Sequence, residues 1–248
     1  MRTILIDGDV ALYSVTKSCE YEQDWGNDFW TLATDMKEAR HRLDLWIGSL
    51  KQNLTADSII IALSGDENWR KDVYPKYKLH RKKHRKPMGF VPLKEYINKV
   101  YRCITYHNLE GDDVLGMLAT CPESKYTGLK GDRIVVSIDK DLKTIPGLHY
   151  NPDKPQDEIY KVDPEQADYN HLFQTLTGDA VDGYPGCPGI GPKRAERLLE
   201  DSVTWDTVVG AYENAGLTEE DALVQARVAR ILRWGDYKRK EVILWNPK

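Results

Sequence analysis

Over the first 140 residues, short apolar runs alternate with stretches in which apolar residues recur at helical spacing. The apolar runs predict strands over residues 2–6, 58–63, 103–106 and 133–138. The run at 58–63 is continuously apolar after its first residue, which is typical of a strand buried on both faces of a parallel sheet. The helical spacing predicts helices over residues 29–54, 92–102 and 112–120. Strands that alternate with helices predict an α/β fold with a mostly parallel sheet flanked by helices.

From Asp163 onward the hydrophobic pattern is helical throughout. It predicts helices over residues 164–177, 192–200, 205–215 and 219–234, separated by turns rich in glycine and proline. We therefore place a soft boundary near Pro155, between a catalytic α/β domain (1–155) and a helical region (156–248) that packs onto it.

Acidic residues follow the carboxyl ends of the predicted strands, where open α/β sheets bind their ligands. A further acidic pair lies in the helical region. The acids concerned are Asp7, Asp9, Asp66, Glu110, Asp112, Asp113, Asp139, Asp141, Asp179 and Asp182. Mg²⁺ and Mn²⁺ prefer oxygen ligands, and two such ions about 3.5–4 Å apart can hydrolyse a phosphodiester. The sequence therefore predicts a metal-dependent nuclease.

The spacing within these clusters fits convergence on one site. In Glu110-Gly111-Asp112-Asp113 the glycine allows a tight turn from strand to helix. Asp139 and Asp141 are two positions apart, which places both on one side if the chain is still extended there. A separation of three residues places Asp179 and Asp182 on one face of a helical turn.

Each of these acids also has an ordinary structural explanation. A single aspartate at a strand end is more often a turn former or a helix N-cap than a metal ligand, and Asp112, Asp163 and Asp179 could each be explained in this way. Asp9 is as well explained by capping the following helix as by metal binding. Doubled acids at successive strand ends have no such explanation, so the clusters together favour metal binding.

The formal net charge of −4 argues weakly against a nucleic-acid partner, but the charge is unevenly distributed. Residues 70–86 hold nine Lys or Arg against one acid, Asp72. With Tyr74 and Tyr77 at its start, this basic segment suits a site that neutralises phosphate and stacks on an unpaired base, and we expect it to order only on binding DNA. A solvated charged face or a localisation signal are the alternatives.

A glycine-rich turn precedes the helix predicted at 192–200. In Gly189-Ile190-Gly191-Pro192-Lys193-Arg194, two glycines and a proline at the first helical position leave backbone N–H groups available to a phosphate, with two cations beside them. Such a contact reads the DNA backbone and not its sequence. An ordinary turn between helices is the alternative explanation.

Several classes of protein are disfavoured by the sequence. The four cysteines lack the spacing of a zinc site or a disulfide framework, which indicates a reduced intracellular protein. The longest aliphatic run, at 59–63, is too short to cross a membrane, and the apolar start is interrupted by Asp7-Gly8-Asp9 before it could form a secretory signal. We expect a cytoplasmic protein with no membrane association.

Five motifs, in this order, resemble those of the 5′→3′ exonucleases and flap endonucleases, especially those of bacteriophages and of the nuclease domain of bacterial DNA polymerase I. The resemblance covers the chain from Ile4 to about Leu199. The motifs are Leu5-Ile6-Asp7-Gly8, Tyr74-Pro75-Lys76-Tyr77-Lys78, Glu110-Gly111-Asp112-Asp113, Ser137-Ile138-Asp139-Lys140-Asp141, and Gly178-Asp179 through Asp182 to Gly189-Ile190-Gly191-Pro192-Lys193.

The resemblance implies a PIN-like sheet domain, a short helical arch or gateway segment (67–102), and a helix–3-turn–helix element (about 172–200). It also implies two Mg²⁺ ions, which Mn²⁺ can replace. The ligands of the first would be Asp7, Asp66, Glu110, Asp112, Asp113 and Asp139, and those of the second Asp141, Asp179 and Asp182. Lys78 and Arg81 would grip the scissile phosphate as catalytic residues. The residues implied to contact DNA are Tyr77, Lys82, Lys83, Gly189, Gly191, Lys193 and Arg194, with K⁺ at the turn formed by the two glycines.

The implied activity is hydrolysis of DNA at 5′ ends, flaps or nicks, with 5′-phosphate products. The protein would act as a monomer in DNA replication or repair. It would do so in the cytoplasm, which is that of the host if the protein is phage-encoded.

Only 23 residues, from Pro87 to Leu109, separate the basic run from the acidic cluster at 110–113, and these must supply a helix and a strand. We therefore expect a short, open arch, unsuited to threading long flaps. The alternatives are a non-catalytic DNA-binding paralogue and a PIN-type ribonuclease. The complete acid set disfavours the first, and the turn at 189–193 the second.

Overall fold

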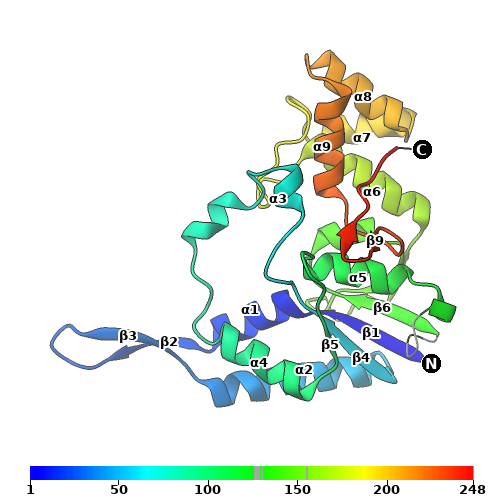
Figure 1. Cartoon of the computed structure of the whole chain (residues 1–248). Helices are drawn as coiled ribbons and strands as arrows, with labels where there is room; N and C mark the ends of the chain where they lie inside the picture. Colours follow the sequence, from blue (N-terminus) through cyan, green and yellow to red (C-terminus); the bar gives the residue numbers. More distant parts are fainter. Residues whose placement is uncertain (126–128, 130, 155, 248) are drawn as a thin grey trace.

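A six-stranded sheet forms the centre of the protein in its computed structural model, which describes residues 1–125, 129, 131–154 and 156–247. The strand order is β5-β4-β1-β6-β7-β8 (Figure 1). The parallel strands are β1 (Arg2–Asp7), β4 (Ser58–Ala62), β5 (Cys103–Ile104), β6 (Asp132–Val136) and β7 (Gly147–Tyr150), and β8 (Tyr160–Val162) runs antiparallel to β7. The prediction of an α/β fold with a mostly parallel sheet is confirmed.

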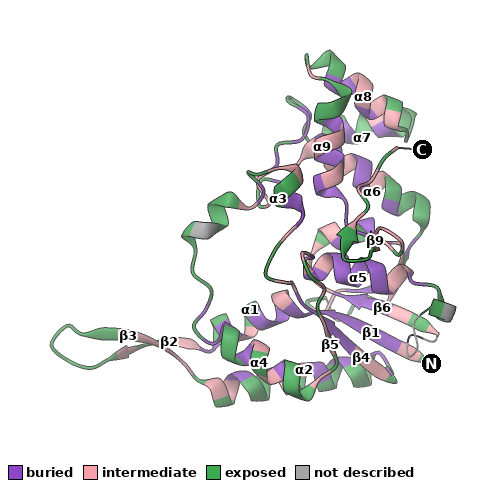
Figure 2. Cartoon of the chain, in the orientation of Figure 1, coloured by how far each residue is buried: buried purple, intermediate pink, exposed green. Residues whose placement is uncertain are grey.

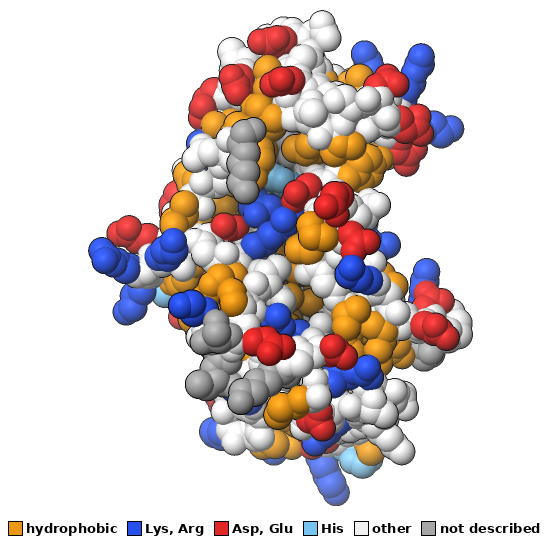
Figure 3. Space-filling model, turned by 90° about the vertical axis from the view of Figure 1, so that its right-hand side faces the viewer, with side chains coloured by type: hydrophobic (Ala, Val, Ile, Leu, Met, Phe, Trp, Pro, Cys, Tyr) orange, Lys and Arg blue, Asp and Glu red, His pale blue; other side chains and the backbone are white. Residues whose placement is uncertain are grey.

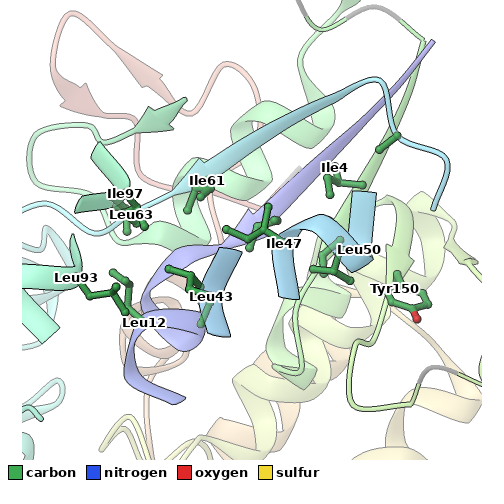
Figure 4. Close-up of a cluster of buried hydrophobic side chains, with 14 of the residues drawn as sticks. Ile4, Leu12, Leu43, Ile47, Leu50, Ile61, Leu63, Leu93, Ile97 and Tyr150 are labelled. Carbon is green, nitrogen blue, oxygen red and sulfur yellow. The ribbon is translucent and has the colours of Figure 1, made fainter. Parts of the chain in front are cut away.

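Both faces of the central strands are covered by helices, so alternate residues of one strand enter different cores. Ile4 and Ile6 of β1 pack with α1 (Gly8–Ser18), α2 (Met36–Asn53) and α4 (Phe90–Val100) (Figure 4). Leu5 packs on the opposite face with α5 (Gly111–Thr120). In Figure 2 the central strands are accordingly buried along most of their length. Burial on both faces explains the uninterrupted apolar run predicted to be a strand.

The helical region has a core of its own. It consists of α6 (Pro164–Thr177), α7 (Pro192–Asp201), α8 (Trp205–Asn214) and α9 (Glu219–Ala229). Leu176, Leu199 and Tyr212 are buried at its centre, and the Tyr212 hydroxyl donates to the Thr175 carbonyl at 2.7 Å. In Figure 1 this region lies above the sheet, joined to it where α3 (Arg70–Val73) packs on α9 and the short 3₁₀ turn η3 (Lys140–Thr144) packs on α6. The boundary residue Pro155 lies outside the described residues.

No helix in the described part of the chain combines the length and apolar character needed to cross a membrane.

The helix predicted over residues 29–54 is wrong at its start. Residues 30–34 form β3 (Trp30–Thr34), which pairs with β2 (Glu20–Asp24) in a hairpin that projects from the molecule (Figure 1). Its turn contains Asn27 and Asp28 with φ of 51° and 62°, a conformation typical of hairpin turns. The helix begins only at Met36, because the carboxylate of Asp35 accepts the backbone N–H groups of Lys37 and Glu38 and caps it.

The last predicted helix, over residues 219–234, is too long by five residues. α9 ends at Ala229, and Arg230 has extended backbone angles. Beyond it the chain returns to the sheet domain, where the Arg230 carbonyl accepts a hydrogen bond from Arg70 at 2.6 Å and the Leu232 N–H donates to Asp113 at 3.2 Å. A small hairpin, β9 (Tyr237–Lys238) and β10 (Glu241–Val242), follows. Hydrogen bonds to distant residues therefore replace the last helical turn.

A buried histidine in the helical region makes the stability of the fold depend on pH. His171 is 2% exposed, and its Nε2–H donates to the Ala226 carbonyl at 2.8 Å. Burial, and then the charge of Arg230, lower its pKa to about 3. Between pH 6.5 and 3 the unfolded chain therefore binds a proton that the folded chain does not. The stabilising contribution is complete above pH 6.5 and is lost as the pH falls toward 3.

We predict that this single proton lowers the free energy of unfolding by about 1.4 kcal/mol per pH unit within that window. Urea unfolding at several pH values will show a shallower acid loss for His171→Asn than for the parent. The exposed His41, replaced in the same way, is the matched control and should leave the slope unchanged. Parallel curves for the parent and His171→Asn would contradict the assignment.

Candidate active site

Acidic residues that follow three of the parallel strands, β5, β1 and β6, lie at one edge of the sheet. Asp7 ends β1, Glu110 follows β5 and begins α5, and Asp139 follows β6 and begins η3. Each also has a capping role. Asp7 accepts the N–H of Val10 at 3.2 Å, and Asp139 accepts the N–H of Asp141 at 2.8 Å. These acids therefore both cap the starts of helices and lie in a cluster, because the capping bonds fix them in position.

The first group of acids surrounds Asp112. Burial, followed by repulsion from Asp7, Glu110 and Asp139, raises the pKa of Asp112 well above its usual range. The pKa of Asp7 is raised to about 6, mainly by burial and further by Asp9 and Asp139, although Ser137 donates a hydrogen bond to it at 2.8 Å. These carboxylates are thus held close enough to repel one another.

The second group lies where η3 meets the start of the helix–3-turn–helix region. Burial, followed by repulsion from Asp139, Asp179 and Asp182, raises the pKa of Asp141 to about 7. Asp179 is 9% exposed, and one of its oxygens accepts the N–H groups of Val181 and Asp182, at 2.6 and 3.0 Å. The residues implied as ligands of the second metal are therefore neighbours in space.

Two cations of the gateway segment lie between the two groups of acids. Lys78 Nζ is 2.7 Å from Glu110 Oε1 and 3.3 Å from Asp182 Oδ2, and Arg81 donates to Asp182 Oδ1 at 2.8 Å. Although burial acts in the opposite direction, Lys78 and then Arg70 lower the pKa of Glu110 to about 2. Lys78 thus joins the sheet domain to the helical region through their carboxylates.

The structure contradicts the prediction that Tyr77 stacks on an unpaired base. Its side chain is 3% exposed and packs with Tyr184 and Val228. Its hydroxyl lies 2.8 Å from Asp182 Oδ2 and 2.9 Å from Glu110 Oε2, and its single proton can be donated to only one of them at a time. A buried ring presents no face to a base, so Tyr77 is a positioning residue for the two acids.

Asp113 is a second correction. It is fully buried, and both of its oxygens accept hydrogen bonds from Arg70, at 2.7 and 2.8 Å. Trp69 Nε1 and the Leu232 N–H add bonds at 3.1 and 3.2 Å. A carboxylate that is saturated by protein donors in this way is the counter-ion of a buried arginine, and the structure contradicts its prediction as a metal ligand.

Asp66 and Asp9 differ from the acids of the two groups. Asp66 is exposed. Asp9 does not cap the first helix, because that position belongs to Asp7. Its Oδ2 instead accepts the Ser64 N–H at 2.8 Å, which fixes the loop after β4 against α1.

The basic segment is anchored at several points, contrary to the expectation that it orders only on binding DNA. Arg70 is buried and Arg81 is paired with Asp182, while Arg85 makes two bonds, of 2.7 and 2.8 Å, to Glu20 at the base of the β2–β3 hairpin. Lys83 is exposed, and the side chain of Lys82 lies outside the described residues. In contrast to the basic segment, the face of the molecule shown in Figure 3 has positive and negative side chains that are interspersed.

The glycine turn opens onto solvent. Gly189 has φ +74°, and a side chain at Gly191 would meet no atom within 4 Å. Gly191 is the N-cap of α7 without a side-chain cap, and Lys193 and Arg194 are exposed beside it. The first-turn N–H groups of a helix lack partners within the helix, so this turn can approach a phosphate closely.

Three residues of the site escaped prediction. Arg70 fixes Glu110 and Asp113, Ser137 donates to Asp7 and accepts the Asp139 N–H, and Gln174 donates to Asp141 at 2.6 Å. Only Ser137 carried a usable signal, since a serine two residues before an acid commonly forms such a turn. Arg70 was one cation among nine, and Gln174 was one polar residue on a helix.

Acids at the ends of parallel strands, together with basic gateway residues and a glycine turn, define a nuclease with a PIN-like fold. The model of the 5′–3′ exonuclease N-terminal resolvase-like domain matches residues 31–158, just over half of the chain. The chain is 32% identical to an exodeoxyribonuclease of Enterobacteria phage T3, over 99% of this chain and 93% of the relative. It is 29% identical to the flap endonuclease Xni of Shewanella oneidensis, over 78% and 76%.

Among solved structures, the zinc-bound 5′-exonuclease of T5 is similar in fold, with a TM-score of 0.69 and 16% identity over 92% of this chain and 89% of that one. The chain therefore belongs to the 5′–3′ exonuclease family, and it is a nuclease.

Proposed function

We propose that this nuclease uses divalent metal ions to hydrolyse DNA at 5′ ends and 5′ flaps, releasing products with 5′-phosphates. The observation that carries the proposal is the pair of partly buried, mutually repelling acid groups on either side of Lys78. Burial of charge without compensation destabilises a protein, so such groups are maintained where function needs them. The relatives are exonucleases and flap endonucleases, which supports the same substrate class here.

The donor set fits Mg²⁺ or Mn²⁺, because it consists of carboxylate oxygens without thiolate or imidazole. In the described part of the chain, however, no three His, Cys, Asp or Glu side chains have the arrangement of a complete metal site. The carboxylates of Glu110 and Asp182 are instead paired with Lys78 and Arg81. We infer that these two cations leave the carboxylates when metal and DNA enter the site.

Two sets of residues would then hold the ions. Asp7, Glu110, Asp112 and Asp139 would hold one, and Asp141, Asp179 and Asp182 the other. When bound, such ions polarise the phosphodiester and lower the pKa of an attacking water. Released from its acids, Lys78 has an ammonium group placed between the two sets, where it can bind the scissile phosphate, and Arg81 can bind it beside Lys78. Tyr77 would hold the carboxylates of Glu110 and Asp182 in position relative to each other.

We predict that Mg²⁺ raises the melting temperature, and does so more at pH 8 than at pH 6. The pKa values of Asp7 and Asp141, raised to about 6 and about 7, mean that lowering the pH protonates the acids that Mg²⁺ requires. The same shifts mean that the metal-free protein gains stability as the pH falls through those values. At about ten times its Kd, Mg²⁺ adds about 1.4 kcal/mol, equivalent to about 3–6 °C.

Thermal unfolding with and without Mg²⁺, at constant ionic strength, measures this difference. The Asp7→Asn/Asp141→Asn variant should lose most of the Mg²⁺ effect. A melting temperature that is indifferent to Mg²⁺ at both pH values would argue against these acids as ligands.

Specificity for DNA is tested by comparing substrates of one sequence as DNA and as RNA. The open turn at Gly189–Lys193 supports a duplex-binding DNA nuclease over a PIN-type ribonuclease. Faster cleavage of RNA than of DNA would reverse that choice. A non-catalytic paralogue would bind DNA without metal-dependent cleavage.

Two finer points belong to the same proposal. Mg²⁺ is the ion we expect in the cell, with Mn²⁺ able to replace it, and K⁺ would bind backbone carbonyls at the Gly189–Gly191 turn. The proposed ligands all come from one chain, which supports action as a monomer. Replacing K⁺ by Na⁺ should weaken duplex binding if the turn uses the larger ion.

A further inference from the structure

The acids proposed to hold the second ion are each bonded to the protein through one of their two oxygens. These acids, called here the second set, are Asp141, Asp179 and Asp182. Asp179 Oδ1 accepts the N–H groups of Val181 and Asp182, at 2.6 and 3.0 Å, and Asp179 Oδ2 lies 3.6 Å from the exposed Lys140. Because the two N–H groups belong to the turn that follows Asp179, one of its oxygens is committed to the backbone and the other faces only a mobile cation.

Asp182 shows the same division between its oxygens. Its Oδ1 is paired with Arg81 at 2.8 Å, and its Oδ2 lies 2.8 Å from the Tyr77 hydroxyl and 3.3 Å from Lys78 Nζ. In the metal-bound state proposed for the site, the two cations leave, whereas the Tyr77 ring is 3% exposed and stays in place. With the Tyr77 hydroxyl bonded to Oδ2, Asp182 has Oδ1 to offer.

Asp141 differs from these two acids because its donor is a single side chain from another element. Gln174 on α6 donates through Nε2 to Asp141 Oδ1 at 2.6 Å, and Asp141 Oδ2 accepts no hydrogen bond from the part of the chain that the structure describes. A separate bond, from Asn170 Nδ2 to the Lys143 carbonyl at 2.8 Å, also joins α6 to η3. The bond to Asp141 can therefore be removed while η3 stays attached to α6.

The number of oxygens that a carboxylate offers distinguishes small divalent ions from larger ones. Mg²⁺ requires nearly octahedral geometry, and the two oxygens of one carboxylate lie too close together to fill two positions at right angles. Ca²⁺ accepts more oxygens in a flexible arrangement and commonly takes both oxygens of one carboxylate. An acid with one oxygen committed to the protein therefore suits Mg²⁺ or Mn²⁺ better than it suits Ca²⁺.

We propose that Gln174 is a positioning residue that limits Asp141 to one metal-binding oxygen, and that it thereby sets the preference of the second set for Mg²⁺ or Mn²⁺ over Ca²⁺. The proposal rests on the proposed metal-dependent function of these acids. Backbone N–H groups limit Asp179 in the same way, but a substitution cannot remove them. Gln174 is accordingly the position at which a single substitution changes the preference.

Competition for Mn²⁺ measures this preference without DNA. Electron paramagnetic resonance of free Mn²⁺ at pH 8 gives its binding, and displacement by Mg²⁺ and by Ca²⁺ gives both dissociation constants. In Gln174→Met we expect the affinity for Mg²⁺ to fall about tenfold or more, because Asp141 loses the bond that orients it. The affinity for Ca²⁺ should fall less, because Asp141 can then offer both oxygens. The ratio of the Ca²⁺ constant to the Mg²⁺ constant should therefore fall about fivefold or more.

Two further variants assign the effect to the bond between Gln174 and Asp141. In an Asp141→Asn background, Gln174→Met should leave the ratio unchanged, because the carboxylate that it acts through is absent. The matched control is Asn170→Ala, which removes the other bond between α6 and η3 and should keep the ratio of the parent. An equal fall of the ratio in Asn170→Ala would mean that the packing of α6 on η3 sets the preference, and would overturn the proposal.

If Gln174→Met does not fold, Gln174→Asn serves in its place, since it keeps the amide but is one methylene too short to reach Asp141. An unchanged ratio in the variant that folds would overturn the role of Gln174. So would Mn²⁺ binding by the parent that Asp141→Asn leaves unaltered. Metal-dependent cleavage is measured on the same preparations, so that the two proposals fail separately. A parent that binds Mg²⁺ at the second set but cuts no DNA would refute the nuclease proposal and leave the role of Gln174 intact.

Discussion

Replacing Asp141 by asparagine will reduce DNA cleavage by a factor on the order of 10³ or more while making the folded protein more stable. Cleavage falls because the proposed second ion loses a charged ligand, and a loss of about 4 kcal/mol of transition-state stabilisation corresponds to that factor. Stability rises because burial and the neighbouring acids raise the pKa of Asp141 to about 7, so its charge opposes folding above that pH.

At pH 8 we expect the free energy of unfolding to increase by about 1 to 2 kcal/mol. The gain is smaller than the whole pKa shift implies, since the asparagine also changes the hydrogen bond from Gln174. Urea unfolding and initial cleavage rates on one preparation measure both effects. Asp157→Asn, at an exposed position outside the acid groups, is the control and should change neither. Loss of activity together with loss of stability would mean that Asp141 has a structural role only.

Replacing Arg70 by methionine will lower the free energy of unfolding by about 3–5 kcal/mol, equivalent to about 6–20 °C in melting temperature. The change leaves Asp113 buried without its counter-ion and leaves the carbonyls of Val228 and Arg230 without a donor. Because Arg70 also bonds to Glu110, the loss should reduce activity beyond the fraction unfolded.

The exposed neighbour Lys71 provides the matched control, and Lys71→Met should change stability by less than about 0.5 kcal/mol. Asp113→Leu in the Arg70→Met background should recover part of the loss, because it removes the unpaired charge. If Arg70→Met does not fold, Arg70→Lys serves instead, since it keeps the charge but loses the two-pronged geometry. We expect it to lower the free energy of unfolding by more than about 1 kcal/mol, because about one hydrogen bond to a charged group is lost. A neutral Arg70→Met would refute the account of this ion pair.

The sequence was sufficient to place the acids at one edge of the sheet. Strand ends can be located from the apolar runs, and parallel strands bring their carboxyl ends together. The structure accordingly groups Asp7, Glu110 and Asp139, whose strands β1, β5 and β6 are far apart in sequence. This part of the site follows from local pattern and topology alone.

The sequence could not separate a metal ligand from a counter-ion within one cluster. Asp112 and Asp113 are adjacent acids, yet one repels its neighbours and the other is neutralised by Arg70. The difference depends on a residue 43 positions away and on the N–H of Leu232, 119 positions away. Tyr77 was misjudged for the same reason, since a buried tyrosine and a stacking one have the same local sequence.

The β2–β3 hairpin shows a limit of periodicity. Residues 30–34 fit a helical stripe as well as an alternating strand, and only the capping of α2 by Asp35 decides between them. Pairing with β2 then fixes the strand, through contacts that the local pattern of either segment does not contain.

The most direct test of the proposed activity is the cleavage of 5′-labelled flap and nicked duplex DNA, with Mg²⁺ or with EDTA, by the parent and by Asp141→Asn. The acid groups predict labelled products from the parent with Mg²⁺, none with EDTA, and a rate for Asp141→Asn that is lower by on the order of 10³. Absence of a metal-dependent product from either DNA, or an Asp141→Asn variant that cuts as fast as the parent, would contradict the account.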